Sequence, residues 1–200
     1  MIKFIVAGSI GLLFAGCSHM AMNDGDTGSA IPLVWKPTMS MAQSGTIDMT
    51  GRANARVRVE VTDSRGDAAL IGRNSEKLPP RKVTTPDSVK AFVNEHLSQL
   101  ISGTGVIDVD NSGPVVLKAD IQQFFVEETE TYNGDVRLKV TLTDSSGRSV
   151  WTGLTSGASM RFGRSYSAEN YYETLSDSLV DAVRNLMQSA TFRDALAAAS

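Results

Sequence analysis

The chain has 200 residues, of which 42% are hydrophobic and 20% charged, with a formal net charge of −3 and a single cysteine. This composition is sufficient for one packed domain and excludes wholesale disorder, and the mild acidity argues against nucleic acid or anionic lipid headgroups as partners of the folded domain. Because there is only one thiol, internal disulfide bonds and cysteine-rich metal sites are excluded as well.

Residues 1–16 have the pattern of a secretory signal peptide. Lys3 supplies a basic start, and the apolar run 4–14 is too short to span a bilayer. The run Leu13-Phe14-Ala15-Gly16-Cys17 resembles the lipobox of bacterial lipoproteins, with Phe14 where leucine is usual. The resemblance implies cleavage after residue 16 and acylation of Cys17. We therefore expect membrane attachment through several acyl chains, which together anchor a protein stably.

Ser18 bears on which membrane receives the protein. An aspartate directly after the cysteine retains enteric-type lipoproteins in the inner membrane, and serine stands there instead. This favours the outer membrane and its periplasmic face. Residues 18–30 are small and polar, which is typical of a flexible tether. We therefore predict a tether over 17–30 after the acylated Cys17 and a single domain over 31–200.

The first half of the domain is expected to contain a strand pair and a helix. After the apolar segment 31–35, alternation of valine with charged residues predicts a half-buried strand from residue 56 to 61. A turn signal at 63–66 then predicts a returning strand at 68–72. A helix is expected with Thr85 as its N-cap and Gly103 at its end. Its apolar positions recur at helical spacing at Val89, Phe92, Val93, Leu97, Leu100 and Ile101.

The second half is expected to contain a short strand over 105–109, three long strands and a closing helix. Residues 115–125 and 136–142 alternate apolar and polar side chains around a polar hairpin loop at 127–134, and a third strand follows over 149–162. One apolar face per strand is typical of an antiparallel sheet covered on one side. Helices are expected from about Ser167 and from Thr191. The predicted fold is α+β, a two-layer sandwich of a mostly antiparallel sheet with two main helices on one face.

The order of these parts is similar to that of the YajG family of bacterial lipoproteins. The segments that carry the resemblance are Asp87 to Gly105, Gly113 to Leu117, Val136 to Gly147, and Tyr171 to Asp194. The family is itself largely uncharacterised, so the resemblance implies a lipoprotein fold and transfers no active-site residue. More distantly, the arrangement resembles small lipoproteins that assist envelope machines, which is an analogy of fold alone.

Two patterns raise the question of a metal site. Residues 108–113 match the first half of a calcium loop, but Ala119 stands where a bidentate carboxylate is required, so a turn between strands is preferred. His19 lies in the tether near several methionines, and a soft-metal site is conceivable there. Methionine more often fills gaps in a core, so we predict no metal. The methionines concerned are Met20, Met22, Met39, Met41 and Met49.

The remaining polar candidates favour structural interpretations. His96 flanks the apolar stripe of its helix, and neither histidine has a nucleophile at a recognisable spacing, so no catalytic triad is predicted. Glu127, Glu128 and Glu130 are interpreted as a hairpin tip covered by water. We therefore predict no catalytic, cofactor or metal residues, and Cys17 is the one predicted site.

The uncovered face of the sheet is the most interesting surface. Phe124, Trp151 and Val116 lie out of phase with the inward stripes, so they would form an exposed apolar patch of the kind that often binds a partner. The alternative is that the segment around Trp35 covers them.

These observations predict a lipid-anchored, periplasm-facing protein of the outer membrane that is not an enzyme. Its expected role is to bind another component of the cell envelope, with an envelope protein as partner and no nucleic acid. The alternative is a module that binds an apolar or lipidic small molecule between the sheet and the helices. An enzyme acting on the wall or on lipid has the least support.

Overall fold

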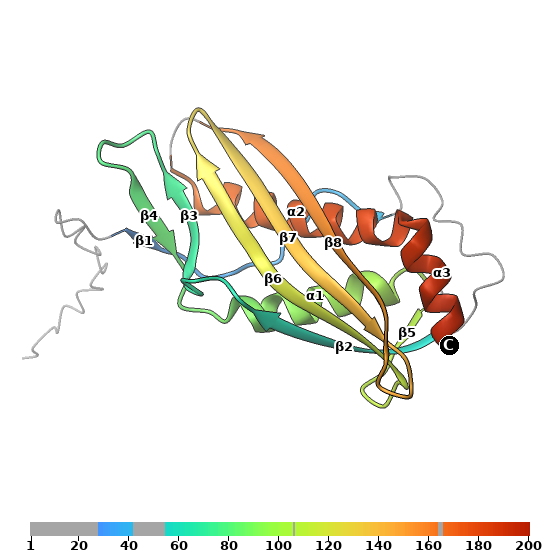
Figure 1. Ribbon diagram of the computed structural model, residues 1–200. Helices are drawn as coiled ribbons and strands as arrows, with labels where there is room; N and C mark the ends of the chain where they lie inside the picture. The colour runs from blue at the N-terminus through green and yellow to red at the C-terminus, as the bar shows by residue number, and fades with distance from the viewer. Residues whose placement is uncertain (1–27, 42–54, 106, 164–165) are drawn as a thin grey trace, which may run out of the picture.

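The computed structural model describes residues 28–41, 55–105, 107–163 and 166–200, and it confirms the predicted α+β class (Figure 1). The strands are β1 (Ser29–Ala30), β2 (Ala55–Asp63), β3 (Leu70–Asn74), β4 (Arg81–Thr84), β5 (Ile107–Val109), β6 (Val115–Glu128), β7 (Thr131–Thr143) and β8 (Ser149–Phe162). The helices are α1 (Val89–Ser102), α2 (Ala168–Gln188) and α3 (Ala190–Ala199). The predicted signal peptide, Cys17, His19, Met20, Met22 and Met49 lie outside the described residues.

β6 is the central strand of a mixed sheet. β7 runs antiparallel along one side of β6, and β8 follows it. On the other side β2 and then β3 pair with β6 in parallel. β5 lies beside β2, whereas β4 and β1 lie beside β3. The prediction of a mostly antiparallel sheet is wrong, because four of the seven pairings among the described strands are parallel. Alternation of side chains shows which face of a strand is buried, but it does not indicate the direction of the neighbouring strand.

The predicted hairpin between β2 and β3 is also wrong. The chain leaves the sheet after Asp63 and returns at Leu70 in the same direction, so β3 continues along β6 where β2 stops. Arg65 stabilises this loop: its guanidinium pairs with Asp63 and donates to the carbonyl oxygens of Ala68 and Leu70 at 2.7 and 2.8 Å. The predicted turn residues therefore form a bend between two parallel segments.

The core lies between the sheet and a layer of helices. Figure 1 shows α1 and α2 on the same face of the sheet, as predicted, with α2 crossing behind β7 and β8. The inward residues of β7 alternate as expected and are fully buried at Val136, Leu138, Val140 and Leu142. Leu97 of α1 and Leu179 of α2 meet the core from the helix side and are also fully buried. The opposite face of the long strands is left without a helix.

A shift of register in β6 reverses the predicted burial of its second half. The pairing with β7 slips between Ile121 and Gln123, so Phe124 and not Phe125 points into the core. Phe124 is fully buried and its ring lies 6.0 Å from that of Phe92 on α1. An extra residue in one strand exchanges the two faces beyond it. The predicted exposed patch is therefore wrong for Phe124.

The other two members of that patch are covered as well. Val116 is only 8% exposed, and the ring of Trp151 packs edge-on against Phe192 of α3 at 5.2 Å. The alternative, coverage by the segment around Trp35, is also wrong, because Trp35 stacks on α1 in the helix layer.

The helix ends follow local capping chemistry. α1 is capped by Ser88 and not by Thr85: the Ser88 hydroxyl accepts the amide of Ala91 at 3.2 Å. Gly103 ends α1, and Ser167 precedes α2, as predicted. Serine 189 caps α3 in place of the predicted Thr191. Among the described helices, none combines the length and the apolar character needed to cross a bilayer.

α2 covers the middle of β8, the strand that ends the sheet beyond β7. A side chain at Gly157 would overlap the backbone of α2, so the glycine permits a direct backbone contact between strand and helix. The amide of Asn185 donates to the carbonyl of Ser156 at 2.8 Å, and the Asp181 carboxylate accepts the amide of Ala158 at 3.0 Å. Helix side chains thus occupy outward backbone groups of this edge strand.

Candidate functional site: the N-terminal strap and its anchor on α2

Residues 31–41, which we call the strap, lie across the helix layer after β1. The predicted apolar segment supplies the contacts: Ile31 is buried, and Leu33 and Trp35 pack against the core. The indole of Trp35 stacks on the imidazole of His96 with ring centroids 4.1 Å apart and planes 9° apart. The other face of the cluster is Phe92, 4.5 Å from His96. His96 is therefore a buried packing residue rather than a boundary residue.

The backbone of the strap is hydrogen-bonded to residues far along the chain. The amide of Ile31 donates to the carbonyl of Thr84 at 2.9 Å, continuing the pairing of β1 with β4. The amide of Leu33 donates to the Asp87 carboxylate at 2.7 Å, and the amide of Lys36 donates to the Ser176 hydroxyl at 2.9 Å. Side chains of other elements thus hold an extended segment that has no neighbouring strand over most of its length.

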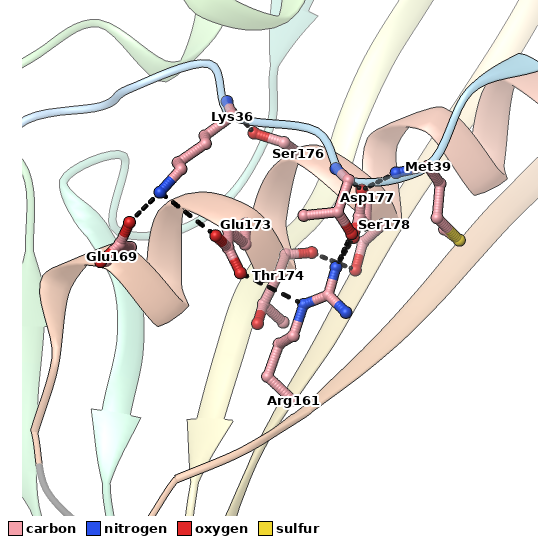
Figure 2. Close-up of polar contacts among 10 residues, drawn as sticks. Lys36, Met39, Arg161, Glu169, Glu173, Thr174, Ser176, Asp177 and Ser178 are labelled. Atoms are coloured by element: carbon pink, nitrogen blue, oxygen red, sulfur yellow. Dashed lines mark hydrogen bonds and ion pairs between the residues drawn. The ribbon is translucent and has the colours of Figure 1, made fainter.

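Asp177 of α2 is the main anchor of the strap (Figure 2). Its side chain is fully buried, and one carboxylate oxygen accepts the amides of Thr38 and Met39 at 2.7 and 2.9 Å. The other oxygen accepts the Thr38 hydroxyl at 2.7 Å and the guanidinium of Arg161 on β8. Arg161 also forms an ion pair with Glu173 at 3.6 Å. One carboxylate therefore joins the strap, the helix and the sheet.

Lys36 adds a second, weaker connection between the strap and α2. Its ammonium pairs with Glu169 and lies 3.3 Å from Glu173 (Figure 2). Lys36 is 42% exposed and Glu169 61% exposed, so water screens this pair and we assign it at most about 1 kcal/mol.

A second buried carboxylate lies where β6 turns into β7. Glu128 is fully buried and accepts the hydroxyls of Tyr132 at 3.0 Å and Tyr171 at 2.8 Å. The Tyr132 oxygen also accepts the amide of Ser167, the residue that precedes α2, at 2.9 Å. Burial, together with the hydrogen bond to Glu128, raises the pKa of Tyr132 to about 12 and raises that of Tyr171 as well. This cluster fixes the start of α2 against the β6–β7 turn.

The prediction of a water-covered acidic tip is wrong for Glu128. It holds for Glu130, which is exposed in a turn much shorter than expected. Glu127 lies on the sheet surface and pairs with Arg73 at 2.8 Å. The register shift in β6 places residue 128 on the inward face together with 124 and 126, and this could not be known from alternation alone.

The calcium-like turn at 108–113 is closed by its own side chains. Asp110 accepts the amide and the hydroxyl of Ser112, both at 2.9 Å, and pairs with Arg56. The Ser112 amide first and the Arg56 guanidinium second lower the pKa of Asp110 to about 2. Across the described residues, no group of three or more histidine, cysteine, aspartate or glutamate side chains is arranged to hold a metal ion.

The geometry of these clusters indicates what they can do. Glu128 and Asp177 are fully buried, and hydrogen-bond donors occupy both oxygens of each, so neither carboxylate is accessible to a substrate in solution. Sequence reasoning missed Asp177; its only signal is the polar run Ser176-Asp177-Ser178 beside the apolar stripe of α2. Both clusters hold the helix layer in place.

The surface has hollows, but the space between the layers is filled. One hollow of about 680 Å³ lies between β2 and the start of α1, and Glu60 and Lys90 are among its lining residues. Between the sheet and the helices, Leu97, Leu117 and Leu179 are fully buried in mutual packing. The described residues thus give more support to binding at a surface than to an apolar ligand held between the layers.

Comparison with protein families gives one match over most of the chain. A family model described as an uncharacterized lipoprotein matches residues 42–197. A search of curated proteins finds no significant match.

Several solved structures share the fold at low sequence identity. Protein XCC0632 from Xanthomonas campestris is 11% identical, with 84% of this chain and 96% of that chain covered and a TM-score of 0.54. PelC from Paraburkholderia phytofirmans, described as a dodecamer, is 12% identical over 69% of this chain and 89% of its own, with a TM-score of 0.41. Lipoprotein GNA1162 from Neisseria meningitidis is 14% identical over 60% and 90%, with a TM-score of 0.27.

Proposed function

Since the chain belongs to the family of uncharacterised lipoproteins known as the YajG family, we propose that it is an outer-membrane lipoprotein anchored through Cys17 and facing the periplasm. Its proposed role is that of a non-catalytic accessory protein that binds another protein of the cell envelope. The observation that carries the proposal is the lipobox-like run that ends in the only cysteine of the chain. Ser18, where aspartate would retain the protein in the inner membrane, supports the outer membrane.

The structure supports a binding role through the uncovered face of the sheet. Lys118 of β6 and Lys139 of β7 are exposed on this face, together with apolar side chains of β8. Leu154 is 73% exposed and Met160 54% exposed. Apolar residues among charged ones, on a rigid sheet, are typical of surfaces that bind another protein. The helix face, in contrast, is already occupied by the strap.

The anchoring part of the proposal is tested by Cys17→Ser. We expect the native protein to incorporate labelled palmitate and to move with outer membranes in a density gradient, whereas Cys17→Ser does neither. Ser18→Asp should leave acylation intact and shift the protein to the inner membrane; Ser18→Thr is the matched control. Native-like fractionation and migration of Cys17→Ser would contradict the proposal.

The binding part is tested by photo-crosslinking in intact cells. A photoreactive residue at Leu154 should give a discrete adduct with an envelope protein, identified by mass spectrometry. Lys90, exposed on α1, is the control position and should give no such adduct. Equal crosslinking from both positions, or none from position 154, would show that the sheet face is not the binding surface.

A further inference from the structure

One end of the sheet gathers four parts of the chain, and we call it the proximal end. Asn74 at the end of β3 lies beside Glu128 at the end of β6, and Glu128 lies beside Tyr132 of β7. Tyr132 in turn lies beside Arg161 near the end of β8. The loop 75–80, the β6–β7 turn and the end of β8 therefore lie at the same end (Figure 1).

The chain also enters the fold at this end. β1 runs parallel to β4, with Ser29 beside Val83, so the residues before β1 approach from the end where β4 begins at Arg81. Eleven peptide steps separate Cys17 from Gly28, and they span at most about 40 Å. An acyl anchor on Cys17 thus brings the proximal end closer to the lipid than any other part of the domain.

Two large apolar side chains are exposed at the proximal end. Leu78, in the loop between β3 and β4, is 92% exposed, and Phe162, the last residue of β8, is 82% exposed. Leucine or phenylalanine side chains exposed to this extent gain free energy when another apolar phase covers them. Prolines at positions 79 and 80 follow Leu78 and limit the conformations of the loop, which lowers the entropic cost of inserting it.

The same loop carries basic side chains. Lys77, Arg81 and Lys82 are exposed, and within the described part of the chain no ion pair joins them to an acid. Glu76 is the one acidic residue between Ser75 and Lys82. The negative net charge of the chain argued against anionic headgroups for the domain as a whole, but this end has the opposite sign. Basic residues beside exposed apolar ones fit the boundary between phosphate headgroups and acyl chains.

From these observations we propose that the proximal end docks on the phospholipid leaflet that holds the acyl chains of Cys17. Leu78 and Phe162 insert into the leaflet, and Lys77, Arg81 and Lys82 contact headgroup phosphates. The inference rests on the proposed lipid anchor and adds an orientation to it: the long strands point away from the membrane, and the β7–β8 turn lies farthest from it. The occupant is the lipid surface itself, because the anchor places it there.

The test uses the mature acylated protein in vesicles of phosphatidylethanolamine and phosphatidylglycerol. Because the only native sulfhydryl is acylated, a cysteine introduced by Leu78→Cys or Phe162→Cys is the single site for an environment-sensitive fluorophore. Ser145→Cys, exposed in the β7–β8 turn, is the control at the opposite end. Labels at 78 and 162 should show blue-shifted emission and quenching by nitroxide lipids several-fold stronger than the label at 145.

The outcomes separate this inference from the anchor. If mass spectrometry shows acylation and the protein floats with vesicles, but labels at 78 and 162 emit as in water like that at 145, the docking is wrong and the anchor stands. If emission is blue-shifted without quenching by lipid, another protein copy covers the residues and the docking is equally wrong. If the protein is not acylated, both proposals fail. Circular dichroism of each labelled variant verifies that it is folded.

Discussion

Replacing the buried carboxylate in Asp177→Ala should detach the strap from the helix layer. The substitution leaves the amides of Thr38 and Met39 and the Thr38 hydroxyl without their acceptor, and each such loss costs about 1 kcal/mol. Arg161 also loses its buried partner and retains only Glu173. Together we expect a loss of about 3–5 kcal/mol in the free energy of unfolding, a large share of the ~5–15 kcal/mol of a typical domain.

Two measurements check the size and the location of this effect. Urea unfolding followed by tryptophan fluorescence gives the free energy, and Trp35 within the strap should shift to longer wavelength when its stacking on His96 is lost. Hydrogen exchange of peptides covering residues 36–41 should become faster, whereas exchange in β7 should not change under native conditions. Asp177→Asn keeps an acceptor for the two amides but turns a donor toward Arg161, so it should lie between native and alanine.

The matched control is Glu169→Ala on the same helix. Glu169 pairs with Lys36 at the exposed side of the strap, and its loss should cost no more than about 1 kcal/mol. If Asp177→Ala and Glu169→Ala give the same stability and the same exchange in 36–41, the assignment of Asp177 as the anchor is refuted.

Three further predictions concern packing and titration. Gly157→Ala should destabilise the domain by about 1–3 kcal/mol in urea unfolding, because a methyl group there overlaps the backbone of α2, whereas Gly66→Ala, with open space around it, should be neutral. The lowered pKa of Asp110 means that its stabilisation is complete above about pH 3.8 and is lost as the pH falls through about 2; Asp110→Asn should flatten the stability–pH curve in that range and leave it unchanged at pH 7. The raised pKa of Tyr132 means that its contribution is complete below about pH 10 and is lost as the pH rises through about 12, so Tyr132→Phe should remove one late transition from the absorbance titration at 295 nm. Tyr171→Phe should cost about 1–3 kcal/mol in urea, because it removes one donor from Glu128; an unchanged midpoint would contradict the role of that hydrogen bond.

Local patterns predicted the elements well where the sequence itself determines them. The bounds of β8 match the predicted strand, and α2 begins directly after Ser167 as expected. These elements have long, regular periodicity. The N-cap of α1 was placed three residues early, at Thr85, because both positions carry a hydroxyl and the choice depends on Asp87, which the strap engages from elsewhere in the chain.

Features that depend on distant residues could not be predicted. The register shift after Ile121 decides that Phe124 and Glu128 are buried, and nothing in the alternation of β6 announces it. Glu128 is acceptable inside the fold only because Tyr171, 43 residues away, donates to it. Asp177 likewise depends on amides about 139 residues earlier. Spacing along one element does not reveal such pairings, and the candidate site was therefore missed from sequence.

The covered middle of β8 has a consequence for a protein confined to a surface. Anchoring restricts copies to two dimensions and raises the frequency of their collisions, and an open strand at the margin of a sheet would then invite growth of one sheet into the next. Asn185 and Asp181 already occupy the carbonyl and amide groups that such growth would need. Neighbouring copies cannot polymerise through the centre of this strand, however densely a leaflet is populated.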